Sequence, residues 1–122
     1  NAIHNIVLLA RYSMEILFLK ERGVDFVVLN GELSLENFVD THKRIDDYCA
    51  ANAGIKHLSI DLTHLTYVDS SGLGAFIRAK KMMSTRGAKF SLCGPSDQVL
   101  KVFHLGGFDK FFTIFPKRAD VC

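Results

Sequence analysis

The residues that could do chemistry in this chain gather between Asp69 and Gly74, in the order Asp, Ser, Ser, Gly, Leu, Gly. They follow a predicted strand and precede a predicted helix, where the first backbone N–H groups of the helix have no partner within it. Those N–H groups and the helix dipole favour an anion, and a serine hydroxyl placed there faces solvent. The structural alternative is that Asp69, Ser70 or Ser71 only caps the helix.

A serine nucleophile with a histidine base is the enzymatic alternative for the same segment. His57 and His64 are close to Ser71 in sequence, but no spacing fixes either imidazole against the hydroxyl, and the motif is not GxSxG. The chain also lacks the glycine-rich P-loop motif that cradles nucleotide phosphates. We therefore expect neither catalysis by this chain nor a bound cofactor.

Cysteine content, net charge and the length of the apolar runs argue against several classes of site and partner. Cys49, Cys93 and Cys122 form no CxxC pair and have no histidine at metal-ligand spacing, which favours a reducing, cytoplasmic setting without a metal site. Fifteen basic and thirteen acidic residues give a net charge of +2, too balanced for nucleic-acid capture by bulk charge. The apolar run at residues 6–10 is far shorter than the ~20 residues of a membrane helix, so membrane insertion is not expected.

The motif at residues 69–74 must be held in place by the surrounding fold. The pattern of apolar residues predicts strands that alternate with helices. Residues 15–20 and 25–29 indicate a hairpin of two strands, followed by a turn at residues 30–31. This order is typical of an α/β fold with a mixed central sheet and helices packed against it. The later elements are predicted as helix 35–52 capped by Ser34, strand 57–62, a bend at 63–66, a helix from Ser71 to before Gly87, strand 89–93, a helix capped by Ser96 or Asp97, and strand 111–115.

The length of 122 residues fits one domain, expected over residues 14–116, with a C-terminal tail over residues 117–122. Residues 1–13 are an N-terminal extension whose apolar residues fit a leading helix, an added strand or a contact in a homodimer. The chain does not begin with methionine, so residues 1–2 could be an artificial remnant, or the chain a piece of a longer protein.

The segment from Tyr67 to Gly74, preceded by a strand that ends in Asp61 and Leu62, resembles the signature of STAS domains, the anti-sigma factor antagonists. The resemblance covers about residues 14–116. Three further segments resemble the family in its own order: residues 30–33 its turn after the second strand, residues 92–95 its strand and turn before the last helix, and residues 103–108 the end of that helix.

The resemblance implies a regulatory switch protein. In the family, an anti-sigma factor that is also an ATP-dependent serine kinase phosphorylates the antagonist. Only the unmodified antagonist binds that factor and frees the sigma factor. The phosphorylated serine maps onto Ser71. The residues expected to contact the partner are Asp69, Ser70, Ser71, Gly72, Leu73, Gly74, Ser34 and Arg78.

Two of these positions have a second interpretation. Ser34 stands where the family often has an aspartate near the acceptor serine, so the loop has lost one negative charge, yet serine and aspartate are equally good helix N-caps. Arg78 belongs to a basic strip with Lys80, Lys81 and Arg86 on the second helix. That strip either meets an acidic partner surface or is a solvated helix face.

The same resemblance admits an alternative function. STAS modules also accompany anion transporters, lipid-transport complexes and stress-sensing scaffolds. In such an assembly the domain would act as a binding module without a phosphorylation switch. The boundaries of the full-length gene would distinguish this alternative from a single-domain antagonist.

Overall fold

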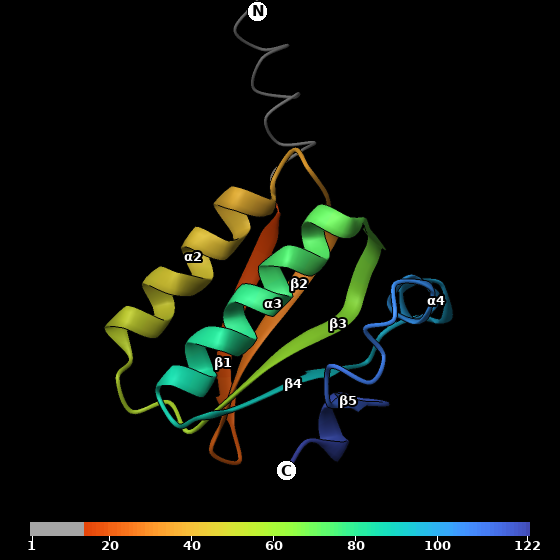
Figure 1. Cartoon of the computed structure of the whole chain (residues 1–122). Helices are drawn as coiled ribbons and strands as arrows, with labels where there is room; N and C mark the ends of the chain where they lie inside the picture. Colours follow the sequence, from red (N-terminus) through yellow and green to blue (C-terminus); the bar gives the residue numbers. More distant parts are fainter. Residues whose placement is uncertain (1–13) are drawn as a thin grey trace, which may run out of the picture.

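Five strands form one mixed sheet in the computed structural model, which describes residues 14–122 (Figure 1). Their spatial order follows the sequence order, and the first pair is antiparallel while the other pairs are parallel. The predicted hairpin is confirmed: its tight turn places Arg22 and Gly23 at positive φ, as the favoured two-residue hairpin turns require. The strands are β1 (Glu15–Glu21), β2 (Val24–Leu33), β3 (His57–Val68), β4 (Lys89–Cys93) and β5 (Ile114–Phe115).

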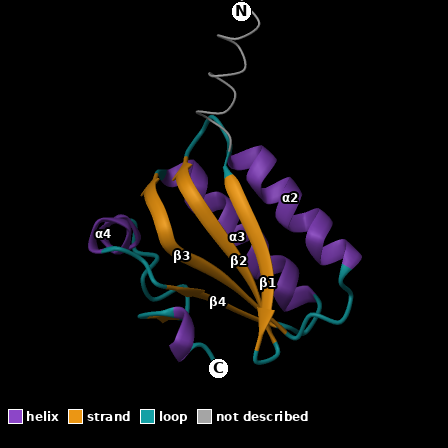
Figure 2. Ribbon diagram, turned by 180° about the vertical axis from the view of Figure 1, so that it is seen from behind, coloured by secondary structure: helices purple, strands orange, loops and turns teal. Residues whose placement is uncertain are grey.

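Two helices cover one face of the sheet. α2 (Phe38–Ala51) and α3 (Ser70–Thr85) lie side by side there, and α4 (Asp97–Leu105) lies near the end of β3 (Figures 1 and 2). Seen from behind, β1, β2 and β3 stand in front of α2 and α3 (Figure 2). The expected α/β fold with helices against a mixed sheet is therefore confirmed.

The main core fills the space between the sheet and the helices. α3 contributes a stripe of buried side chains at helical spacing, including Leu73, Phe76 and Met83, which pack on strand residues such as Leu58 and Ile60. Burial of this stripe fixes the rotation of α3 about its axis. Residues on the opposite stripe of α3 are thereby directed to solvent.

The segment expected as a C-terminal tail packs against the other face of the sheet. Val121 is buried in a small cluster with Val24, Phe26 and Cys93. A 3₁₀ helix (Arg118–Asp120) precedes it, and the Arg118 guanidinium bonds to Asp61 Oδ2 at 3.0 Å. Residues 117–122 are thus part of the folded domain.

Several predicted boundaries were wrong. Residues 30–31 lie inside β2, and residues 63–66 inside β3, because these two strands continue to pair as far as Leu33 and Val68. Local turn signals such as Asn-Gly are weaker than this parallel pairing. The last strand covers only residues 114–115, since residues 111–113 form the approach to it and bury Phe112 in the main core.

The proposed roles of residues 1–13 lie outside the described residues. Within residues 14–122, no helix has both the length and the apolar character needed to cross a membrane.

Candidate functional site

The predicted site lies at the junction between β3, which ends at Val68, and α3, which begins at Ser70. Asp69 between them is the N-cap of α3. Its backbone is extended, and its Oδ1 accepts a hydrogen bond from the Gly72 N–H at 3.0 Å. The sequence left three candidate caps, and the structure selects Asp69. Ser70 and Ser71 are therefore the first two residues of the helix, one residue earlier than predicted.

The second carboxylate oxygen of Asp69 reaches across to the loop between β2 and α2. Asp69 Oδ2 accepts a hydrogen bond from the Leu35 N–H at 3.2 Å. The Asp69 N–H in turn donates to the Leu33 carbonyl at 3.3 Å. One side chain thus holds the start of α3 against a loop 34 residues earlier in the chain, a connection that no local pattern predicts.

Ser71 lies in the first turn of α3 and is half-buried, whereas Ser70 is exposed. Among the described residues, no side chain or backbone group bonds to the Ser71 hydroxyl. The hydroxyl thus forms no hydrogen bond within the described domain, while its backbone is fixed by the helix. A phosphate on this oxygen would lie beside the N-terminal end of α3, where helices tolerate negative charge.

Gly72 and Leu73, which the sequence placed among the partner contacts, are buried. They pack beneath the site and present no exposed surface to a partner. A Cβ on Gly72 would lie 2.6 Å from Val68 Cγ2 and 2.9 Å from the Leu33 carbonyl oxygen. Glycine is required here because the start of α3 is pressed against the ends of β2 and β3. Gly74 is exposed, and a Cβ there would meet nothing within 4 Å.

We expect Gly72→Ala to lower the free energy of unfolding by about 2 kcal/mol, because a methyl group must push back both a core side chain and a backbone oxygen. Gly74→Ala is the matched control. It should raise the free energy by about 0.5–1 kcal/mol, since alanine is the better helix former and has room. Urea unfolding of both variants measures the difference, and equal midpoints would contradict the packing argument.

Ser34 does not cap α2, which corrects the prediction. α2 begins at Phe38 with Asn37 as its N-cap, so the helix starts three residues later than expected. Residues 34–37 form a turn in which the Ser34 carbonyl accepts hydrogen bonds from the N–H groups of Asn37 and Phe38. The Ser34 hydroxyl instead contacts the Glu36 carboxylate. The Ser34 side chain thus has the carboxylate of Glu36 beside it.

Exposed apolar side chains beside this turn are functional candidates that the sequence reasoning missed. Leu35 is 67% exposed and Val39 is 55% exposed. The Leu35 backbone is bonded to Asp69, so its side chain lies next to the motif. The sequence shows Leu35 as an apolar residue at the start of a predicted helix. Because that helix was predicted to begin too early, Leu35 was not recognised as an exposed loop residue.

Arg78 points to solvent from α3, as predicted, but it is not free. Its Nε and one terminal nitrogen donate to Asp46 Oδ2 of α2 at 3.1 and 2.8 Å. Arg78 therefore joins the two helices that cover the sheet. The other members of the predicted basic strip diverge: Lys80 lies over the Phe111 ring, and Arg86 donates to the Cys49 carbonyl at 2.8 Å.

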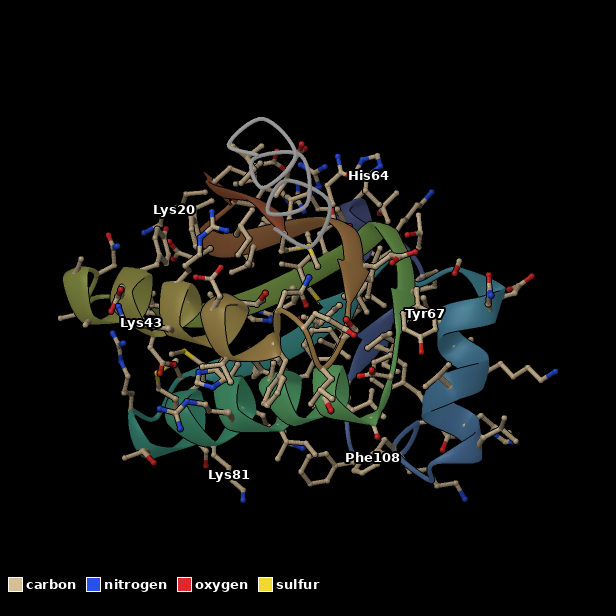
Figure 3. All side chains as sticks on the ribbon, turned by 90° about the horizontal axis from the view of Figure 1, so that it is seen from above. Lys20, Lys43, His64, Tyr67, Lys81 and Phe108 are labelled. Atoms are coloured by element: carbon tan, nitrogen blue, oxygen red, sulfur yellow. The ribbon has the colours of Figure 1, made fainter. Side chains whose placement is uncertain are left out.

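The histidines considered as bases lie elsewhere. His57 opens β3 at the end remote from Ser71, and its Nε2 bonds to Ser91 Oγ at 2.8 Å. Burial, with a contribution from Lys89, lowers the pKa of His57 below its ordinary value of 6.5. His64 is exposed and points to the sheet face opposite α3 (Figure 3). Neither imidazole is placed to activate the Ser71 hydroxyl.

The two buried cysteines are not placed for reactivity. Burial is the main cause that raises the pKa of both Cys49 and Cys93 to about 11, so both remain protonated thiols at neutral pH. Across the part of the chain that the structure describes, no three histidine, cysteine or carboxylate side chains converge on a metal position. The chemistry of the site therefore rests on hydroxyl and carboxylate groups.

Comparison with known proteins gives a family match that covers most of the chain. The sequence model of the STAS domain matches residues 16–121. An anti-sigma-B factor antagonist of Listeria monocytogenes is 32% identical over 98 residues, which span 79% of this chain and 84% of that protein.

Solved structures of related proteins have the same fold. The crystal structure of a putative anti-sigma factor antagonist from Thermotoga maritima superposes with a TM-score of 0.78 at 25% identity, covering 86% of this chain and 89% of that one. The phosphorylated form of the Bacillus cell fate determinant SpoIIAA shares the fold, with a TM-score of 0.60 at 19% identity over 84% of this chain and 90% of that one.

Proposed function

This chain belongs to the STAS domain family, and from that premise we propose that it is an anti-sigma factor antagonist whose partner binding is switched by phosphorylation of Ser71. The unmodified protein binds an anti-sigma factor that is also a serine kinase. The kinase transfers the γ-phosphoryl group of ATP to Ser71 Oγ, the hydroxyl proton is lost, and ADP leaves. The modified protein then dissociates.

The observation that carries this proposal is the state of the Ser71 hydroxyl. It has no bonding partner among the described residues, it stands in the first turn of α3, and the Asp69 cap holds that turn in place. A kinase needs an acceptor oxygen that is accessible and fixed in position. The half-burial of Ser71 and its fixed backbone in α3 support this role.

A phosphate on Ser71 would act on binding more than on folding. It adds about −1.5 to −2 charges at neutral pH, and the N-terminus of a helix tolerates them. At a closed interface the phosphate must lose its water, at a cost of several kcal/mol. The Asp69 and Glu36 carboxylates add to the negative charge of the same surface. Phosphorylation should therefore separate the two proteins and leave each one folded.

Glu36 places a carboxylate next to Ser34. The family resemblance expects an acid at position 34, near the acceptor serine. In this structure the Glu36 carboxylate contacts the Ser34 hydroxyl, so the loop keeps an acidic group beside position 34. The turn that carries Glu36 is bonded to the motif through Leu35 and Asp69. This arrangement supports a retained phosphorylation switch.

Ser71→Ala tests the proposal directly. We expect a purified anti-sigma-B or anti-sigma F factor to phosphorylate the wild-type protein with ATP and to leave Ser71→Ala unlabelled. Ser84→Ala is the matched control, because Ser84 is an exposed hydroxyl at the far end of the same helix, and it should be labelled like the wild type. Intact-mass analysis gives the readout. Persistent label on Ser71→Ala would refute the acceptor assignment.

A further inference from the structure

A shallow groove of about 450 Å³ runs between α2 and α3, the two helices that cover the sheet. Figure 1 shows the two helices side by side along the length of this face. The groove is lined by one residue of α2 and six of α3: Asp46, Gly74, Ile77, Arg78, Lys81, Met82 and Thr85.

The groove begins at Gly74, about one helical turn beyond Ser71. Ser71, Gly74, Arg78, Lys81 and Thr85 follow one another at spacings of three and four residues, which places them on one stripe of α3. Gly74 is the first groove residue after Ser71, and its missing side chain leaves the near end of the groove open. A chain that contacts Ser71 can therefore continue into the groove without a break.

The chemistry of the groove favours an acidic and apolar occupant. Ile77 and Met82 are half-buried and supply apolar surface. Arg78 is paired with Asp46, whereas Lys81 is exposed and forms no ion pair with another described residue. Figure 3 shows Lys81 pointing away from α3 into solvent. Two cations against one carboxylate leave the groove with a surplus positive charge.

Resting on the proposed function, we infer that this groove is the second half of the partner interface and takes a segment of the anti-sigma factor. The segment places an apolar side chain over Ile77 and Met82 and a carboxylate beside Lys81. The segment's negative charge also makes it sensitive to Ser71, because a phosphate at the open end of the groove repels it. The groove thereby couples the modification to partner release.

Two variants test the groove without touching Ser71. Lys81→Glu reverses the surplus charge, and Gly74→Leu fills the open end, where the helix has room for a side chain. We expect each to weaken binding of an anti-sigma-B or anti-sigma F factor at least tenfold, measured by calorimetry on the full chain. Lys101→Glu on α4 is the matched control and should change affinity less than twofold. The Lys81→Glu effect should shrink at high salt.

A charge exchange identifies the contact. Replacing the matching carboxylate of the anti-sigma factor by lysine should restore binding to Lys81→Glu. Wild-type affinity of both groove variants, with Ser71→Asp still impaired, would overturn the groove and leave the proposed function standing. If the wild-type protein neither binds these factors nor is phosphorylated by them, the proposed function fails, and the groove assignment fails with it.

Discussion

Arg118→Met is expected to lower the free energy of unfolding by about 3 kcal/mol, because it leaves a buried carboxylate without its counter-charge. Asp61 is fully buried, and the Arg118 guanidinium bonds to its Oδ2 at 3.0 Å. Removing one partner of a buried ion pair leaves an uncompensated charge and typically costs 3–5 kcal/mol. The side chain of Arg118 is 32% exposed, so water can replace part of its contact, which favours the lower end.

A second variant separates the loss of stability caused by the unpaired Asp61 carboxylate from the loss caused by missing packing contacts of Arg118. The double variant Arg118→Met with Asp61→Asn should recover a large part of the loss, because a neutral amide needs no counter-charge and can still accept from the Thr63 N–H. Arg22→Met is a matched control: the exposed Arg22 donates to the Arg118 carbonyl and forms a surface ion pair with Glu21 at 3.6 Å, so less than 1 kcal/mol is expected. Guanidinium unfolding measures all three. A double variant no more stable than Arg118→Met would assign the loss to packing.

Phosphorylation of Ser71 is expected to weaken binding of the anti-sigma factor at least ~100-fold, and Ser71→Asp about tenfold. Desolvation of the phosphate costs several kcal/mol, and each 1.4 kcal/mol is a factor of ten in affinity. Ser71→Asp places a smaller charge at the same point, beside the helix N-terminus. The thermal midpoint should therefore move by only a few degrees. Calorimetric titration and thermal unfolding of the same samples give both readouts.

Ser71→Asn separates charge from size. Asparagine has nearly the shape of aspartate without its charge, so Ser71→Asn should keep affinity within about threefold of the wild type. If Ser71→Asp binds as tightly as the wild type, the electrostatic mechanism is wrong. If Ser71→Asn binds the partner as weakly as Ser71→Asp, the loss of affinity comes from the size of the new side chain, and its charge has no separate role.

The sequence predicted the order of strands and helices because their apolar periodicity is a local property. The hairpin, the strand that begins at His57 and the helix that carries Phe76 and Met83 were each visible in a short window. Element ends were less predictable. Residues 30–31 look like a turn, yet they continue β2, since pairing with β3 extends that strand. Hydrogen bonds between distant segments decide such boundaries.

The sequence by itself determined the motif from Asp69 to Gly74 and its place between a strand and a helix. Only the tertiary structure decided how Asp69 is used, because one of its carboxylate oxygens binds its own helix and the other the N–H of Leu35. It likewise decided that Arg118 neutralises Asp61. The bonds of Asp69 to Leu35 and of Arg118 to Asp61 join residues from separate elements, and these partners are set by the packing of the whole sheet.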